Sequence, residues 1–251
     1  MLVLLHGWTA TADLNFFRVY GALAEHFRVL AFDQRGHGSG IRTRAPFRLE
    51  DCADDVVAMA DAIGLDRFVA LGYSMGGAVA QLLGRRHESR LCGLVLVATA
   101  SHFNIDRLSF LGLTGLAAAA RLTPHQAHRW ATGQLYLERK TAAWDGWAKQ
   151  QATAHSWRMV AEAGRALGRF RADPWLGEVD LPVAVVVTMQ DEVVPLTSQI
   201  KLFEAIPDAE AFRLDGGHDA AVAHPARFVR EVTRAMSSVV GRAPADPPDR
   251  R

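Results

Sequence analysis

Short apolar runs alternate with amphipathic stretches at both ends of the chain. The apolar runs, which are typical of β-strands, lie at Leu2–Leu5, Arg28–Phe32, Phe68–Leu71, Gly93–Ala98, Val183–Thr188 and Ala211–Leu214. Several are apolar at consecutive positions, as expected where a strand is buried on both faces of a parallel sheet. Helical patterns separate them, at about Phe16–His26, Leu49–Ile63, Gly76–His87, Thr197–Ala205 and Pro225–Val240. This alternation predicts an α/β fold in which helices flank a mostly parallel sheet of about six strands.

The alternation stops at about Ser101 and resumes near Leu181. The stretch between them is helical in pattern and holds most of the tryptophans, namely Trp130, Trp144, Trp147, Trp157 and Trp175. We interpret residues 101–180 as a helical cap, or lid, inserted into a core formed by residues 1–100 and 181–241. Residues 242–251 are rich in proline and charge and are expected to be a disordered tail.

Charge and composition narrow the classes of function. The chain has 28 Lys and Arg residues against 27 Asp and Glu, with no basic tract, so no nucleic-acid partner is expected. No stretch reaches the roughly 18 apolar residues of a membrane span. The N-terminal apolar run is too short for a signal peptide, so a cytoplasmic protein is expected. Cys52 and Cys92 are interpreted as buried free thiols.

The strongest local motif is Gly-Tyr-Ser-Met-Gly-Gly at residues 72–77, between an apolar strand and a helix. This is the G-x-S-x-G pattern in the context that exposes a serine hydroxyl at the end of a sheet. A turn this tight requires small neighbours, which Gly72 and Gly76 provide. Ser74 is therefore predicted to be a nucleophile, although a serine at this place can also be an ordinary helix N-cap.

A serine hydroxyl needs a base, and the base needs an acid that orients it. Of the ten histidines, His218 directly follows the last predicted strand, at the side of the sheet where Ser74 is expected. His6 and His37 also follow strands but are interpreted as structural. Asp191 follows the strand before the last, and Glu192 is its rival. The chain order Ser, Asp, His is the one expected for a nucleophile on this kind of turn.

Acyl transfer also needs two donors for the oxyanion, and the backbone N–H groups of Met75 and Trp8 are the candidates. Candidate pocket residues for a small, largely apolar substrate are Trp8, Tyr73, Phe103, Phe110, Trp130 and Val193. The cap tryptophans are equally compatible with a small satellite core. No carboxylate or cysteine spacing accompanies the cap histidines, so neither a metal nor a cofactor is expected.

Together these motifs resemble the α/β-hydrolase superfamily. The resemblance rests on His6-Gly7, Asp33–Ser39, the Ser74 turn, Asp191 with Val194-Pro195, and Gly217-His218. It implies the α/β-hydrolase fold, and the GYSMGG turn is most similar to the esterase, lipase and haloperoxidase-like branch. The expected activity is hydrolysis of a carboxylic ester or related acyl bond through an acyl-enzyme on Ser74. A serine at this position argues against haloalkane dehalogenases and epoxide hydrolases, which use Asp.

Several alternatives remain open on the same residues. They are an acyltransferase, a cofactor-free haloperoxidase-like enzyme, a hydrolase of carbon–carbon bonds, and a small-ligand receptor without turnover. One departure concerns the start of the chain. Family members usually have two further, antiparallel strands before the one that ends in His-Gly, and this chain begins at that strand. The Arg28–Phe32 strand is then expected at an open sheet edge, which predicts either an upstream segment or a homodimer through that edge.

Overall fold

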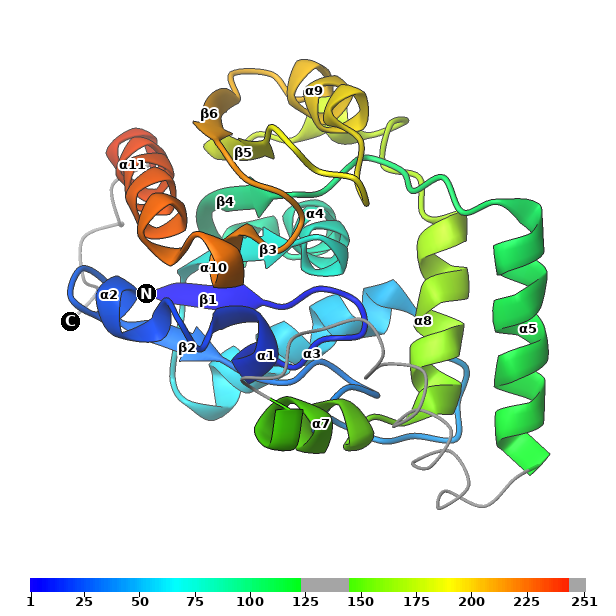
Figure 1. Ribbon diagram of the computed structural model, residues 1–251. Helices are drawn as coiled ribbons and strands as arrows, with labels where there is room; N and C mark the ends of the chain where they lie inside the picture. Colours follow the sequence, from blue (N-terminus) through cyan, green and yellow to red (C-terminus); the bar gives the residue numbers. More distant parts are fainter. Residues whose placement is uncertain (123–144, 244–251) are drawn as a thin grey trace.

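The computed structural model describes residues 1–122 and 145–243, and its centre is one parallel sheet (Figure 1). The strands run in the order β2-β1-β3-β4-β5-β6. Their bounds are Leu2–Leu5 (β1), Val29–Ala31 (β2), Phe68–Tyr73 (β3), Leu91–Val97 (β4), Val183–Thr188 (β5) and Glu210–Leu214 (β6). The predicted α/β fold with a six-stranded parallel sheet is confirmed.

Helices cover both faces of the sheet because successive strand residues point to opposite sides. In β1, Val3 and Leu5 pack into one core and Leu2 and Leu4 into the other. The first core is closed by α3 (Leu49–Ala62), α4 (Met75–Arg86) and α9 (Leu196–Ala205). The second is closed by α11 (Pro225–Arg242) and by the short helices α1 (Ala12–Phe16) and α2 (Tyr20–Ala24). Each neighbouring pair of strands is parallel, so the carboxyl ends of the strands share one edge of the sheet. Strand β1 ends toward the right of Figure 1.

One expected element differs from the structure, and one observed element was not expected. The predicted helix Phe16–His26 is two short helices, α1 (Ala12–Phe16) and α2 (Tyr20–Ala24). The first begins early because Thr11 Oγ1 accepts a hydrogen bond from Leu14 N at 3.0 Å and caps it. A further short helix, α10 (Ala220–Ala223), lies in the loop after β6 and was not predicted.

Helix α11 reaches the first residue of the predicted tail. Arg242 belongs to α11, and its guanidinium donates to the carbonyl oxygens of Asp208 and Val183 at 2.6 and 2.9 Å. These bonds hold the end of the helix against the sheet, so the prediction of disorder from residue 242 was wrong at that residue. Residues 244–251 lie outside the described part of the chain.

The stretch between β4 and β5 is helical where it is described. It contains α5 (Arg107–Leu122), α7 (Asp145–Thr153) and α8 (Trp157–Arg169). Helices α5 and α8 pack against each other beyond the carboxyl ends of the strands (Figure 1). Trp130 and Trp144 lie outside the described residues. The division into a core and a cap at residues 101 and 180 stays a prediction.

The chain leaves the core for this stretch and returns to it at adjacent points. His102 and Arg171 form an isolated antiparallel bridge, and Ala172 N donates to Ser101 O at 2.8 Å. The Ser101 hydroxyl also donates to Asp173 Oδ1 at 2.6 Å. The two connections are therefore fastened to each other where they leave the sheet.

Strand β2 occupies one edge of the sheet, as predicted, and pairs with β1 through Leu2↔Val29, Val3↔Leu30 and Leu4↔Ala31. A homodimer through this edge stays a prediction. Within the described ranges, no helix combines the length and the apolar character that crossing a lipid bilayer requires.

Candidate active site

Ser74 lies on a strained turn between β3 and α4. Its φ of 54° and ψ of −115° are uncommon for a residue with a side chain. The turn is held by Ser74 N, which donates to Val97 O at 3.0 Å, and by Ser74 O, which accepts from the Thr99 hydroxyl at 2.8 Å. A Cβ at Gly76 would lie 2.1 Å from Leu5 O, so only glycine fits there. The close packing of α4 against β1 therefore requires the glycine at position 76.

The Ser74 hydroxyl does not cap the helix that it precedes, because it makes no hydrogen bond to the first helical amides. Instead Ser74 Oγ lies 3.0 Å from His218 Nε2. His218 Nδ1 is 2.9 Å from Asp191 Oδ2. An ionised carboxylate only accepts, so Nδ1 carries the proton and Nε2 is free to accept from the serine hydroxyl. The three sequence-predicted residues therefore form one continuous hydrogen-bonded chain.

The loop after β6 brings His218 to this position. Met189 N donates to Leu214 O and Gln190 N donates to Gly216 O, both at 3.0 Å, so the loops after β5 and β6 run together past the end of the sheet. The Tyr73 hydroxyl donates to His218 O at 2.7 Å and fixes the backbone of the histidine. The imidazole is therefore oriented from two directions, by Asp191 and by Tyr73.

Asp191 is held more tightly than the sequence indicated. Its Oδ1 accepts from the backbone N–H groups of Val193 and Val194 at 2.9 and 2.8 Å, and Oδ2 accepts from the Thr188 hydroxyl at 2.7 Å as well as from His218. Burial acts to raise the pKa of the Asp191 carboxyl, but the hydrogen bonds from His218, Val194 and Thr188 outweigh it and lower the pKa below its ordinary value. The carboxylate is thus stabilised in its charged form.

Gln199 and Thr188 belong to this site, and sequence reasoning missed both. Gln199 Oε1 accepts from Thr188 N at 3.0 Å, and Gln199 Nε2 donates to Thr188 Oγ1 at 2.8 Å and to Val194 O at 2.9 Å. The glutamine is fully buried on α9 and fastens both ends of the Asp191 loop. The rival carboxylate, Glu192, is exposed. The burial that gives Gln199 this role is seen only in the structure, so no sequence signal marked it.

The two candidate oxyanion donors both lie near Ser74. Met75 is the first residue of α4, where an N–H has no carbonyl partner within the helix. Gly7 approaches the serine closely, since a Cβ at Gly7 would lie 3.4 Å from Ser74 Cβ, and its own N–H is bound to Asn15 Oδ1 at 2.8 Å. Within the described part of the chain no acceptor is found for the next amide, Trp8 N–H. The assignment of the Met75 and Trp8 amides as oxyanion donors stays a prediction.

Tyr73 requires a correction among the predicted pocket residues. It is 2% exposed, its ring packs against Phe16 and Phe228, and its hydroxyl is bound to the His218 loop. Like Val69 and Leu71 before it, Tyr73 points to the core on the α11 side of the sheet, so its side chain does not line a substrate pocket.

The other pocket candidates lie apart from one another. Trp8 is half-buried against α8, and Val193 is 67% exposed beside Asp191. Phe103 packs against Phe170, and the guanidinium groups of two cap arginines lie over the ring of Phe110. Trp130 lies outside the described residues. Which of these residues face a substrate stays a prediction.

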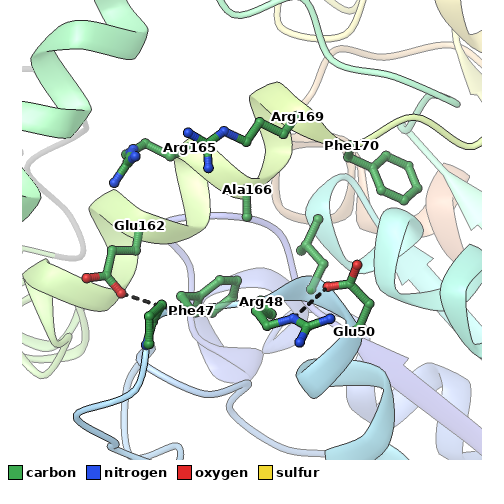
Figure 2. Close-up of a pocket in the computed structure, with 10 residues that line it drawn as sticks. Phe47, Arg48, Glu50, Glu162, Arg165, Ala166, Arg169 and Phe170 are labelled. Carbon is green, nitrogen blue, oxygen red and sulfur yellow. Dashed lines mark hydrogen bonds and ion pairs between the residues drawn. The ribbon is translucent and has the colours of Figure 1, made fainter.

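A cavity of about 410 Å³ lies between the start of α3 and α8 (Figure 2). Residues 46–50 line one wall, and α8 contributes Glu162, Ala166 and Arg169 to the other. The Glu162 carboxylate accepts from Phe47 N at 2.9 Å and joins the two walls. None of the residues in the hydrogen-bonded chain of Ser74 lines this cavity. It is therefore separate from the candidate active site.

Three histidine rings, those of His6, His37 and His155, lie close together near the start of α8. The rings of His6 and His37 are 5.2 Å apart, and those of His37 and His155 are 5.4 Å apart. His6 Nε2 accepts from Gln34 N at 2.9 Å, which confirms the structural role predicted for His6. His155 Nδ1 accepts from Gly38 N at 2.9 Å and joins the segment just before α8 to the loop after β2. No group of three potential metal ligands that could hold an ion is found among the described residues.

Acid is expected to destabilise the protein through these histidines. Burial lowers the pKa of all three, that of His155 to about 4 from 6.5, with Asp33 and Arg42 as the other charged groups nearby. Between pH 6.5 and 4 the unfolded chain therefore binds a proton at residue 155 that the folded chain does not. The unfolding free energy should fall with decreasing pH by about 1.4 kcal/mol per pH unit for each such proton.

Urea unfolding at several pH values measures this slope. His155→Asn is the informative variant, because Asn keeps an acceptor for Gly38 N and does not titrate in this range. In this variant the slope of unfolding free energy against pH should decrease by about 1.4 kcal/mol per pH unit, which is the contribution of one proton. An unchanged slope would show that His155 does not contribute to the acid sensitivity.

A parallel six-stranded sheet with a serine on the strained turn after β3, and with loops after β5 and β6 converging on it, defines an α/β hydrolase. The alpha/beta hydrolase fold family model matches residues 1–225, so the chain belongs to this family and is a hydrolase of it. Proteins named "Putative carbamate hydrolase RutD" are similar to it over most of their length. The one from Variovorax paradoxus is 32% identical over 232 residues, 87% of this chain and 85% of the relative. The one from Agrobacterium fabrum is 30% identical over 220 residues, 82% of each.

Solved structures show the same fold. The enol-lactonase from Burkholderia xenovorans LB400 has a TM-score of 0.78 at 22% identity, over 94% of this chain and 90% of that one. The esterase RhEst1 from a Rhodococcus species has a TM-score of 0.68 at 28% identity, over 95% and 90%.

Proposed function

We propose that this hydrolase cleaves a carboxylic ester or related acyl bond of a small, largely apolar substrate, with Ser74 as nucleophile, His218 as general base and Asp191 as the orienting acid. The observation that carries the proposal is the hydrogen-bonded chain from Ser74 Oγ through His218 to Asp191, with distances of 3.0 and 2.9 Å. Those distances lie within the range that proton transfer requires.

In the proposed first step, Ser74 Oγ attacks the substrate carbonyl carbon while its proton passes to His218 Nε2. The imidazolium that forms is stabilised by Asp191, whose lowered pKa keeps it charged. The carbonyl electron pair becomes an oxyanion, for which the Met75 and Trp8 amides are the proposed donors. His218 then gives its proton to the leaving group, and the acyl group stays on Ser74 as an ester.

In the second step, water attacks the acyl-enzyme. His218 takes the proton of the water as it adds to the carbonyl, and returns a proton to Ser74 Oγ as the acid product leaves. The strained backbone of Ser74 supports this role, because a φ of 54° holds the hydroxyl off the helix amides and toward His218.

A carbamate is the second candidate substrate class. The relatives with 30 and 32% identity over more than four fifths of this chain carry the name "Putative carbamate hydrolase RutD". A carbamate carbonyl would undergo the same attack by Ser74, and an amine or an alcohol would leave. The conjugated nitrogen makes that carbonyl less electrophilic than an ester, so the same site would require stronger oxyanion stabilisation.

The test is covalent labelling followed by a substrate panel. A fluorophosphonate probe should label the wild-type chain at residue 74, identified by mass spectrometry of the labelled peptide. A panel of p-nitrophenyl esters of graded chain length, and of matched p-nitrophenyl carbamates, then separates the two substrate classes by kcat/KM. Labelling without turnover of any ester or carbamate of the panel would favour the small-ligand receptor, and added alcohol acceptors would reveal acyl transfer.

A further inference from the structure

The side chain of Trp8 joins the loop after β1 to helix α8. Its indole Nε1–H donates to the carbonyl oxygen of Val160 at 2.7 Å. The indole ring lies on Gly164, one turn further along the helix, where an added Cβ would be 2.5 Å from Trp8 Cζ2. A real Cβ never approaches a ring carbon so closely, so the absence of a side chain at Gly164 is what allows the contact.

The backbone on either side of Trp8 is held by different parts of the molecule. On one side, Gly7 N–H is bound to Asn15 of the core at 2.8 Å, and Gly7 packs against Ser74. On the other side, Thr9 O lies 3.3 Å from Nε2 of His155, just before α8 begins, and Thr9 has a φ of 61°. The amide of Trp8 therefore lies between two fixed neighbours. Gly7 is held by the core, and Thr9 is held by His155, just before α8.

Helix α8 is itself firmly attached at this end. Ser156 N donates to Gly36 O at 2.8 Å, and the Met159 side chain fills the place that a Cβ at Gly36 would occupy. Residues 159–164 of α8 are buried. A shift of this helix is therefore expected to be transmitted to the Trp8 backbone through two short contacts, the Val160 carbonyl and the face of Gly164.

We propose that Trp8 and Gly164 are positioning residues, through which α8 sets the place of the Trp8 N–H as oxyanion donor. The inference rests on the proposed function, in which that amide stabilises the tetrahedral intermediate. A misplacement of about 1 Å at a reacting group can cost on the order of a hundredfold in rate. Losing one oxyanion donor costs on the order of a hundred- to a thousandfold. A displaced indole should therefore lower kcat and leave ground-state binding largely unchanged.

Two variants disturb the contact from opposite sides. Gly164→Ala places a methyl group against the indole and also against Leu113 of α5, 2.5 Å from Trp8 Cζ2 and 2.8 Å from Leu113 Cδ1. Trp8→Phe leaves Leu113 untouched, keeps an aromatic ring and removes the N–H that binds Val160 O, so an effect shared by both variants belongs to the Trp8 contact. The matched control is Gly168→Ala, the same substitution one turn along α8. Its Cβ would lie 3.3 Å from the edge of the Phe110 ring, which can yield by a few tenths of an ångström, and it does not contact Trp8.

Each variant is assayed with a p-nitrophenyl ester, with kcat expressed per serine titrated by the fluorophosphonate. Inhibition by an alkyl trifluoromethyl ketone is the second readout. Ser74 Oγ adds to that ketone, the proton goes to His218, and the carbonyl oxygen becomes an oxyanion like that of the reaction. In Gly164→Ala and Trp8→Phe, kcat should fall by about tenfold with KM within about twofold, and ketone affinity should weaken by a similar factor. Gly168→Ala should match the wild type.

The outcomes separate this inference from the proposed function. Wild-type protein that neither labels nor turns over would refute the proposed function. Wild-type protein that does both, with variants whose kcat and ketone affinity per titrated serine are unchanged, would refute the coupling alone. A change confined to KM, or to melting temperature, would assign the contact to substrate binding or to stability. If Gly164→Ala does not fold, Trp8→Phe decides the question.

Discussion

Replacing Ser74 by Ala is expected to abolish fluorophosphonate labelling and to lower kcat by about three to six orders of magnitude. The hydroxyl is the only part of the residue that the substitution removes, and His218 Nε2 then has no nucleophile to activate. The fold should be retained, because the turn is held by the backbone N–H and C=O of residue 74, which the variant keeps. Residue 74 already has a side chain at φ 54°, so Ala adds no new backbone strain.

The measurement compares ester hydrolysis of the variant and the wild type at equal protein concentration, with circular dichroism and thermal unfolding as the check on the fold. Thr99→Val is a useful companion. It removes the hydroxyl that binds Ser74 O and should affect stability of the turn more than the chemistry. If Ser74→Ala hydrolysed esters at the wild-type rate, the nucleophile would have to be sought elsewhere.

Asp191→Asn is expected to give the second-largest effect, a fall in kcat of about 10⁴ with little change in KM. The amide of Asn can present its NH₂ group to His218 Nδ1, which would place the imidazole proton on Nε2, where it cannot accept from Ser74. The carbonyl oxygen of Asn can still accept from the Val193 and Val194 amides, so the loop should keep its shape. Hydrogen bonds hold the pKa of the wild-type carboxyl below its ordinary value of 3.8, so the carboxyl is charged at the neutral pH at which the two proteins are compared.

The control for this variant is Glu192→Gln, at the exposed carboxylate next in the chain. It should leave kcat and KM within about twofold of the wild type, as surface substitutions usually do. Full activity in Asp191→Asn together with a loss in Glu192→Gln would exchange the roles of the two carboxylates.

The sequence predicted well the features that depend on neighbouring residues, namely the strands and the turn around Ser74. Six apolar runs became six strands because a buried parallel strand needs apolar residues at consecutive positions, and the glycines around Ser74 marked the turn because no larger residue fits there. The contacts that were missed depend on how separate elements pack against each other. Gln199 supports Asp191 only because α9 packs beside β5, and His155 meets Gly38 across 117 positions. Neither contact leaves a local pattern in the chain.

Tyr73 is an instructive intermediate case. Its position beside the nucleophile suggested a pocket, but strand alternation places it on the same face as Val69 and Leu71, toward α11. The alternation of side chains along β3 therefore already indicated that Tyr73 points into the core. It was a better guide than the position of Tyr73 next to Ser74 in the sequence. The pocket itself could not be predicted from sequence, because it depends on how α5, α7 and α8 pack over the sheet.

The stretch between β4 and β5 departs and returns through neighbouring points, joined by the His102–Arg171 bridge and the bond from Ser101 to Asp173. A change of length in this stretch that kept the two neighbouring ends would leave strands β4 and β5 where they are. A change that reached α8 would also reach the loop after β1, through the contacts of Trp8 with Val160 and Gly164. Changes of substrate selectivity that spare the chemistry are therefore expected in the part of the stretch that does not contact this loop.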